Sequence, residues 1–76
     1  MDYTIMYAEN DHMIVTFNKT GNKFTIIEYL KKNKVIVRKE TFEKFVYAET
    51  WFKARCIANQ LVIKCVDHEL DFANID

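Results

Sequence analysis

Two cysteines and two histidines are the side chains in this 76-residue chain that most readily do chemistry. Cys56 and Cys65 could act as nucleophiles, with His12 or His68 as the base that activates them. No glycine-rich elbow, paired-acid motif or other local catalytic signature surrounds these residues. The pattern therefore favours cysteines that pack as small core residues and histidines that lie at the surface. The sequence predicts a protein that is not an enzyme.

Metal binding is the second chemistry that these side chains could support. Cys56, Cys65 and His68 follow a C-x8-C-x2-H spacing, and Asp67 or Glu69 could add an oxygen ligand. Structural zinc sites are instead built on close pairs of cysteines, which this spacing lacks. A phosphate-binding loop needs several glycines, and the chain has a single one. We expect no metal and no cofactor.

Basic and aromatic side chains are interleaved through residues 23–45, as in proteins that stack the bases of single-stranded nucleic acids on aromatic rings. Alternatively, the aromatic residues form the core, and the lysines are the solvated rim of turns and sheet edges. No ribonucleoprotein-type motif accompanies the charges, so nucleic acid is the less favoured partner. The residues concerned are Phe24, Tyr29, Lys31, Lys32, Lys34, Arg38, Lys39, Phe42, Lys44 and Phe45.

The stretch from residue 45 to residue 66 has the clearest structural pattern. Residues 45–48 alternate in character as a strand does, and the Thr50 side chain is well placed to cap a following helix. Apolar residues then recur every three or four positions, which predicts an amphipathic helix over residues 50–61. The expected packed face of this helix consists of Trp51, Ala54, Ile57, Ala58 and Leu61.

The opposite face of the predicted helix carries Phe52 among basic and polar side chains. Aromatic and arginine residues contribute the most energy per residue at protein interfaces, so this face predicts a partner-binding surface. Alternatively, Phe52 packs beneath residues 42–45 or beneath the C-terminal segment. Together with two residues of the basic segment, the predicted partner-binding set is Phe52, Arg55, Lys53, Asn59, Tyr29 and Arg38.

Alternation of apolar and polar residues before the helix predicts an antiparallel meander. The fold class is therefore α+β, with an antiparallel sheet of four to five strands and one helix packed on one face. The uncovered face presents Thr4, Met6, Ile14, Thr16, Thr25, Ile27, Tyr29 and Ile36, or else the residues that alternate with them. The expected strands are 3–8, 13–18, 24–30, 35–38 continuing through a bulge near 40–43 into 45–48, and 62–66.

Length and composition favour one domain over residues 1–76, with residues 67–76 as an edge strand or a loose acidic tail. The residue pattern at the start lacks the features of a signal peptide, and no apolar run is long enough to span a membrane. We therefore expect a cytoplasmic protein with free thiols. Residues 19–55 carry ten lysines and arginines against four acids, whereas residues 1–18 and 56–76 are acidic. Acidic ends weaken general attraction to polyanions and suit a protein partner with charged patches of its own.

The segment VYAETWFKARCIANQLV, with Val46, Ala48, Thr50, Ala54 and Ala58 at regular spacing, resembles a strand-to-helix element of small bacteriophage proteins. Some anti-CRISPR proteins and phage antitoxins are among them. The resemblance implies a small, non-enzymatic protein that binds and blocks a host protein in the host cytoplasm. The other two hypotheses are a single-strand nucleic-acid-binding module that uses residues 23–45 and a homo-oligomeric structural component, such as a homodimer.

Overall fold

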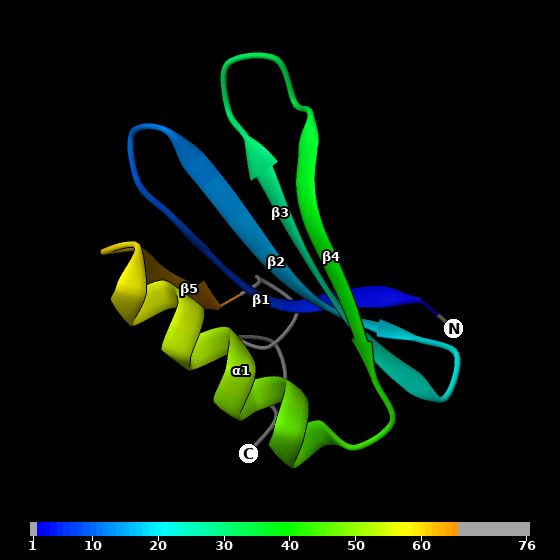
Figure 1. Cartoon of the computed structure of the whole chain (residues 1–76). Helices are drawn as coiled ribbons and strands as arrows, with labels where there is room; N and C mark the ends of the chain where they lie inside the picture. Colours follow the sequence, from blue (N-terminus) through cyan, green and yellow to red (C-terminus); the bar gives the residue numbers. More distant parts are fainter. Residues whose placement is uncertain (1, 66–76) are drawn as a thin grey trace, which may run out of the picture.

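The computed structural model describes residues 2–65, which form five strands and one helix (Figure 1). All five strands belong to one antiparallel sheet, and the helix packs against one face of it, so the predicted α+β fold class is confirmed. The predicted segment 67–76 lies outside the described residues. None of the helical structure within residues 2–65 is long and apolar enough to cross a membrane. The elements are β1 (Tyr3–Glu9), β2 (Met13–Thr20), β3 (Lys23–Leu30), β4 (Ile36–Phe42), α1 (Phe45–Ala58) and β5 (Val62–Cys65).

The strands lie in the order β4-β3-β2-β1-β5, so the first four form a meander and the last returns to the far side of β1. Strands β2 and β3 are joined by a two-residue turn, because Thr20 pairs with Lys23. Gly21 takes φ +65° in this turn, a conformation that glycine adopts without steric cost. Among the described strands, β4 and β5 are the two edges of the sheet.

The hydrophobic core lies between the helix and the sheet. Phe17 of β2 is at its centre, with ring centroids 5.4 Å from both Phe45 and Phe52 of the helix and 6.1 Å from Phe24 of β3. Aromatic pairs at these separations add to the free energy gained by burying their surface. The fully buried core residues are Ala8, Val15, Phe17, Ile26, Ala48, Phe52 and Cys56.

Helix α1 begins at Phe45, six residues before the predicted first turn at Trp51. The prediction of a strand over residues 45–48 is therefore wrong. Lys44 is the N-cap and makes no capping side-chain hydrogen bond, whereas the Thr50 hydroxyl donates to the Val46 carbonyl within the helix at 2.8 Å. A four-residue alternation does not distinguish a strand from a helix, and packing of the Phe45 ring against Phe17 favours the helix here.

The helix ends at Ala58, and the chain leaves it through a Schellman motif. The Gln60 N–H donates to the Ile57 carbonyl at 3.2 Å, and the Leu61 N–H donates to the Cys56 carbonyl at 2.8 Å. Gln60 takes φ 58°, the left-handed conformation that glycine usually supplies at this position. This turn directs the chain into β5 and brings Leu61 against the core.

The face of α1 that packs on the sheet differs from the predicted one. Ala48, Phe52 and Cys56 are buried, spaced by four residues, whereas Ile57 is 79% exposed. Because the helix starts at Phe45, this row of residues runs along its length and inserts the large Phe52 ring into the core. Burying a phenylalanine removes far more apolar surface from water than burying the alanines of the predicted face. Of that predicted face, Trp51 and Leu61 contact the core.

A β-bulge in β1 determines which side chains reach each face of the sheet. Thr4 lies opposite Asn18 but Met6 lies opposite Phe17, so one extra residue separates the two pairs. Met6 consequently packs against the core and not on the open face, where it was predicted. The rest of the predicted set does share the open face, as the strand register shows: Thr4, Ile14, Thr16, Thr25, Ile27, Tyr29 and Ile36.

Candidate protein-binding surface

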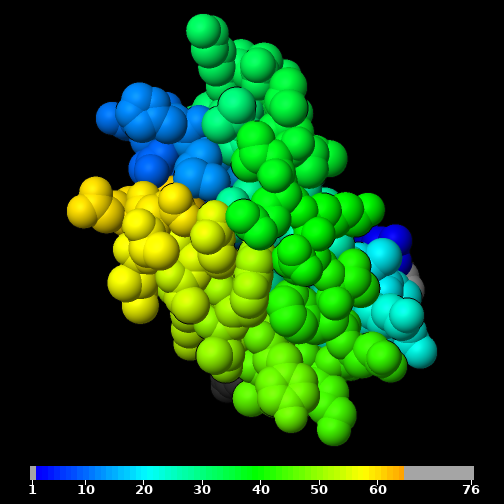
Figure 2. All heavy atoms as spheres, viewed as in Figure 1, coloured from blue at the N-terminus to red at the C-terminus, as the bar shows by residue number. Residues whose placement is uncertain are grey.

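The turn between β3 and β4 closes one end of the sheet and projects beyond the neighbouring β1–β2 turn (Figures 1 and 2). The Leu30 N–H donates to the Val35 carbonyl at 2.9 Å, and the Lys34 N–H donates to the Leu30 carbonyl at 2.8 Å. The Lys31 N–H donates to the His12 carbonyl at 2.9 Å, which ties the two turns together. This end of the molecule is therefore held by backbone hydrogen bonds, although it carries little buried apolar surface.

Apolar side chains gather at this end. Val35, Ile36 and Val37 are each about half exposed, at 49%, 52% and 50%, and Leu30 is 38% exposed. On the open face, Tyr29 lies in register between Ile14 of β2 and Ile36 of β4. A hollow of about 290 Å³ opens here, lined by Ile14, Tyr29, Leu30, Lys31 and Lys34. A cluster of exposed aliphatic side chains on so small a domain is typical of an interaction surface.

Basic side chains surround this apolar cluster. Within the described part of the chain, Lys32, Lys34 and Lys39 have no carboxylate within ion-pair distance, and Arg38 has only a long contact of 3.9 Å to Glu28. The cluster thus combines apolar area with largely uncompensated positive charge. We call it the hairpin-end surface, consisting of Ile14, Tyr29, Leu30, Val35, Ile36 and Val37 with Lys31, Lys32, Lys34, Arg38 and Lys39.

Glu9 lies beside this surface, and two lysines already engage it. Its carboxylate pairs with Lys31 at 2.5 Å and accepts a hydrogen bond from Lys64 of β5 at 3.0 Å. These hydrogen bonds hold the pKa of Glu9 below its usual value, and the Glu9 carboxylate raises the pKa of Lys64. Glu9 therefore neutralises Lys31 in part, and among residues 2–65 Lys32, Lys34 and Lys39 keep no carboxylate within ion-pair distance.

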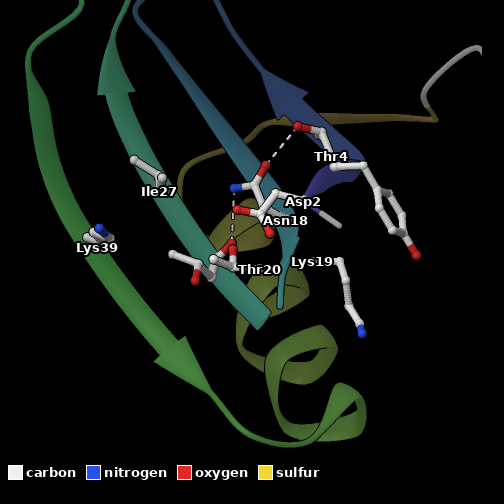
Figure 3. Close-up of a pocket in the computed structure, with 9 residues that line it drawn as sticks. Asp2, Thr4, Asn18, Lys19, Thr20, Ile27 and Lys39 are labelled. Atoms are coloured by element: carbon white, nitrogen blue, oxygen red, sulfur yellow. Dashed lines mark hydrogen bonds between the residues drawn. The ribbon is translucent and has the colours of Figure 1, made fainter. Parts of the chain in front are cut away.

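A second hollow of about 350 Å³ lies on the open face around Asn18 and reaches Lys39 of the hairpin-end surface (Figure 3). Asn18 holds it together, because its amide donates to the Thr16 hydroxyl at 2.9 Å and the Thr25 carbonyl at 3.0 Å. The Asn18 carbonyl oxygen accepts from the Thr4 hydroxyl at 2.7 Å. Since these polar groups are already paired with one another, the hollow presents fewer unused donors and acceptors than its composition suggests.

Two of the six predicted partner-binding residues have structural roles. Phe52 is 0% exposed and packs against Phe17 of the sheet, so its predicted place on an exposed helix face is wrong. Arg55 donates to the buried Glu28 carboxylate from Nε at 2.7 Å and from Nη2 at 3.0 Å. The hydrogen bonds to Glu28 raise the pKa of Arg55 further, and its guanidinium also lies over the Trp51 ring, 5.7 Å from the centroid.

Of the remaining four predicted residues, two belong to α1 and its C-cap and two belong to the strands β3 and β4. Lys53 is exposed on α1 and pairs with Glu49 at 3.5 Å, while Asn59 is the helix C-cap and its amide donates to the Arg55 carbonyl. Tyr29 and Arg38 both belong to the hairpin-end surface, but they lie on opposite faces of the sheet, because Tyr29 pairs with Ile36 of the open face and Arg38 pairs with the core-facing Glu28. The structure thus does not bring the six together, and the role of Tyr29 and Arg38 in partner binding stays a prediction.

Of the cysteines and histidines considered for chemistry, the structure describes the side chains of Cys56 and His12. Cys56 is buried in the core, and burial, with a smaller contribution from Glu28, raises the pKa of its thiol to about 11. A thiol with such a pKa is almost fully protonated at neutral pH and is a poor nucleophile. His12 lies exposed in the β1–β2 turn, and His68 lies outside the described residues. No cluster of three or more metal-ligating side chains occurs within residues 2–65.

Two features of this region could have been predicted from the sequence, although the helix and strand periodicities did not reveal them. Glu28 occupies the same face of β3 as Phe24 and Ile26, so its position in the alternation marks a buried acid that needs a cationic partner. Three consecutive aliphatic residues, Val35–Val37, break the alternation of a half-buried strand and mark a bulge beside exposed apolar surface.

A scan against protein-family models, a search of curated proteins and a search of solved structures each returned no match to this chain.

Proposed function

We propose that this chain is a small, non-enzymatic binding protein that blocks or modulates another protein by occupying its surface. The hairpin-end surface supports this proposal most strongly, because it joins exposed aliphatic side chains to unpaired lysines on a rigid sheet. Interfaces of this composition bind by burying apolar area at the centre and by charge complementarity at the rim. The inert, buried Cys56 thiol also favours binding over covalent chemistry.

The resemblance to small bacteriophage proteins makes a host protein our proposed target, in the host cytoplasm. That resemblance was based on a strand-to-helix element, and residues 45–48 belong to the helix, so the phage assignment rests on the helical alanine spacing alone. Surface occupation requires no catalytic group from the chain. It requires a stable surface and a complementary partner.

Single-stranded nucleic acid is the second candidate, supported by Tyr29 beside Lys31 and Lys34 at the hollow. A base could stack on the tyrosine while the lysines contact phosphates. Val35, Ile36 and Val37 favour the protein partner, because exposed aliphatic side chains have no ring on which a base can stack.

Affinity capture from bacterial lysate tests the proposal when it is done with three versions of the tagged full chain. These are the unmodified chain, the double variant Tyr29→Ala/Ile36→Ala, and the control Ile57→Ala, which removes an exposed aliphatic side chain far along α1. We expect one stoichiometric protein, retained after nuclease treatment, that the double variant binds about 10- to 100-fold more weakly and the control binds normally.

Equal retention by all three versions would show that the partner contacts another surface. If captured protein is retained only when nuclease is omitted, the chain binds nucleic acid, and that binding should fall steeply with salt.

A further inference from the structure

The outer edge of β4 is the part of the hairpin-end surface where backbone groups face solvent. β4 is an edge strand, and no described residue pairs with the side that faces away from β3. Alternate N–H and C=O groups of such an edge point outward, where another strand can pair with them. Val35, Ile36 and Val37 lie at one end of this edge, each about half exposed. The edge therefore presents hydrogen-bonding groups and apolar surface together.

Charge determines which strand this edge can accept. A second copy that pairs antiparallel about residue 38 or 40 would place Arg38 or Glu40 directly opposite itself, and like charges directly opposite one another are destabilising. The bulge at Val37 further disrupts a regular ladder between copies. Lys34 and Lys39 attract a strand that carries carboxylates. These features select against self-pairing and in favour of an acidic partner strand.

We propose that β4 binds an extended acidic segment of a protein partner, which joins the sheet as a further strand. This inference rests on the proposed binding function and specifies the partner chemistry and the mode of recognition. The segment pairs its backbone with residues 38–42 and places carboxylates on the open face near Lys39 and, beyond its end, near Lys34. Such strand addition takes affinity from the main chain and specificity from alternate side chains.

The test uses the isotopically labelled full chain and a synthetic capped heptapeptide, Glu-Val-Glu-Val-Glu-Val-Glu, followed by amide chemical shifts and hydrogen exchange. We expect the β4 amides to shift and to exchange more slowly as the peptide is added. Two control peptides separate the contribution of backbone pairing from that of charge. Replacing two valines by proline removes backbone donors while keeping the charge, and replacing glutamate by lysine reverses the charge. Neither control should protect β4.

Matched variants of the protein test the charges. Lys34→Glu/Lys39→Glu should weaken binding of the acidic heptapeptide about tenfold. Lys23→Glu at the opposite end of β3 is the control, because Lys23 is also exposed and is the first residue of that strand. The Lys23→Glu variant should bind the acidic heptapeptide with the affinity of the unmodified chain.

Four results would overturn the inference. If the proline peptide binds as well as the parent, attraction is purely electrostatic and no strand is added. If shifts appear at Ile14 and Tyr29 without any along β4, the inference is wrong, although the hairpin-end surface still binds and the proposed function stands. If an oligothymidylate displaces the peptide and binds more tightly, the edge serves nucleic acid. If the outward-pointing amides of β4, which do not pair with β3, are already protected in the free full chain, the occupant is a segment of this chain or a second copy, which dilution distinguishes.

Discussion

The guanidinium of Arg55 holds the carboxylate of Glu28 by two hydrogen bonds, of 2.7 and 3.0 Å, at a position where Glu28 is only 1% exposed. This pair joins α1 to β3 across the layer that also contains Phe52 and Cys56. A buried carboxylate costs several kcal/mol to desolvate, and this cost is recovered only while the partner stays in place. The docking of the helix on the sheet therefore depends on Arg55.

Replacing Arg55 by methionine should lower the free energy of unfolding by about 2–3 kcal/mol. This is below the full range for a buried pair, because Arg55 is partly exposed. Lys53→Met is the matched control, since Lys53 makes an exposed helical ion pair with Glu49, and it should cost about 0.5 kcal/mol or less. Urea denaturation measures both. The double variant Glu28→Leu/Arg55→Leu should recover part of the loss, and equal costs for Arg55→Met and Lys53→Met would contradict this account.

Truncating Phe52 should destabilise the fold far more than truncating Ile57, although both residues are on α1. Phe52→Ala leaves a cavity beside Phe17 and should destabilise the fold by about 3–5 kcal/mol. Ile57→Ala removes a side chain that is 79% exposed and should change stability by about 0.5 kcal/mol or less. Thermal unfolding followed by circular dichroism compares the two, and a larger effect at Ile57 would restore the helix face predicted from the sequence.

Gln60 adopts a left-handed conformation at the end of α1, and glycine there should stabilise the protein. Gln60→Gly removes the steric cost of a side chain at φ 58° and should add about 0.5–1 kcal/mol to the free energy of unfolding. Gln60→Ala keeps that cost and should bring no gain. If both variants shift the unfolding midpoint equally, the backbone conformation is not the cause.

The buried thiol of Cys56 should resist alkylation. With Cys65→Ser removing the second thiol, iodoacetamide labelling of the folded protein at pH 8 should be at least about a hundredfold slower than labelling in urea. The rate should continue to rise with pH toward about 11, the raised pKa of this thiol. A plateau near pH 9 would show that the thiol is neither buried nor perturbed.

The lowered pKa of Glu9 predicts a small acid sensitivity. Its hydrogen bonds from Lys31 and Lys64 favour the ionised carboxylate in the folded state. A folded pKa below the unfolded value adds stability above the unfolded pKa, and this stability is lost as pH falls through the folded pKa. The pKa of Glu9 measured from its carboxyl chemical shift should lie below the ordinary value for a glutamate, and Lys31→Gln/Lys64→Gln should return it toward that value. An unchanged pKa in that variant would rule out this pairing in solution.

The sequence predicted the sheet well because its signals are local. Alternation located β1, β2, β3 and β5 to within two residues, and the single glycine marked the β2–β3 turn. It failed at residues 45–48, because Val46 and Ala48 fit the period of a strand while Phe45 and Ala48, three positions apart, fit that of a helix. Only the packing of Phe45 against Phe17 and Phe24, which are distant in sequence, decides in favour of the helix.

The candidate site was predicted only in part, for a related reason. The hydrophobic spacing of the helix places Phe52 opposite the alanines, but burial depends on which residues the sheet can accommodate. Tyr29 and Arg38 were singled out from composition and Ile36 was placed on the predicted uncovered face, whereas Val35 and Val37 were assigned to an ordinary strand. Whether such residues are covered depends on strand order, and the edge position of β4 follows from β5 pairing with β1 at the other side.

The pairing of β5 with β1 has a mechanical consequence. Met6 lies opposite Cys65, so the first strand enters and the last strand leaves the sheet at the same end, side by side. A force applied between residues 2 and 65 would act along the backbone hydrogen bonds of this ladder and load them in succession. The molecule should therefore open like a zipper at low force, with β5 peeling away before the meander yields.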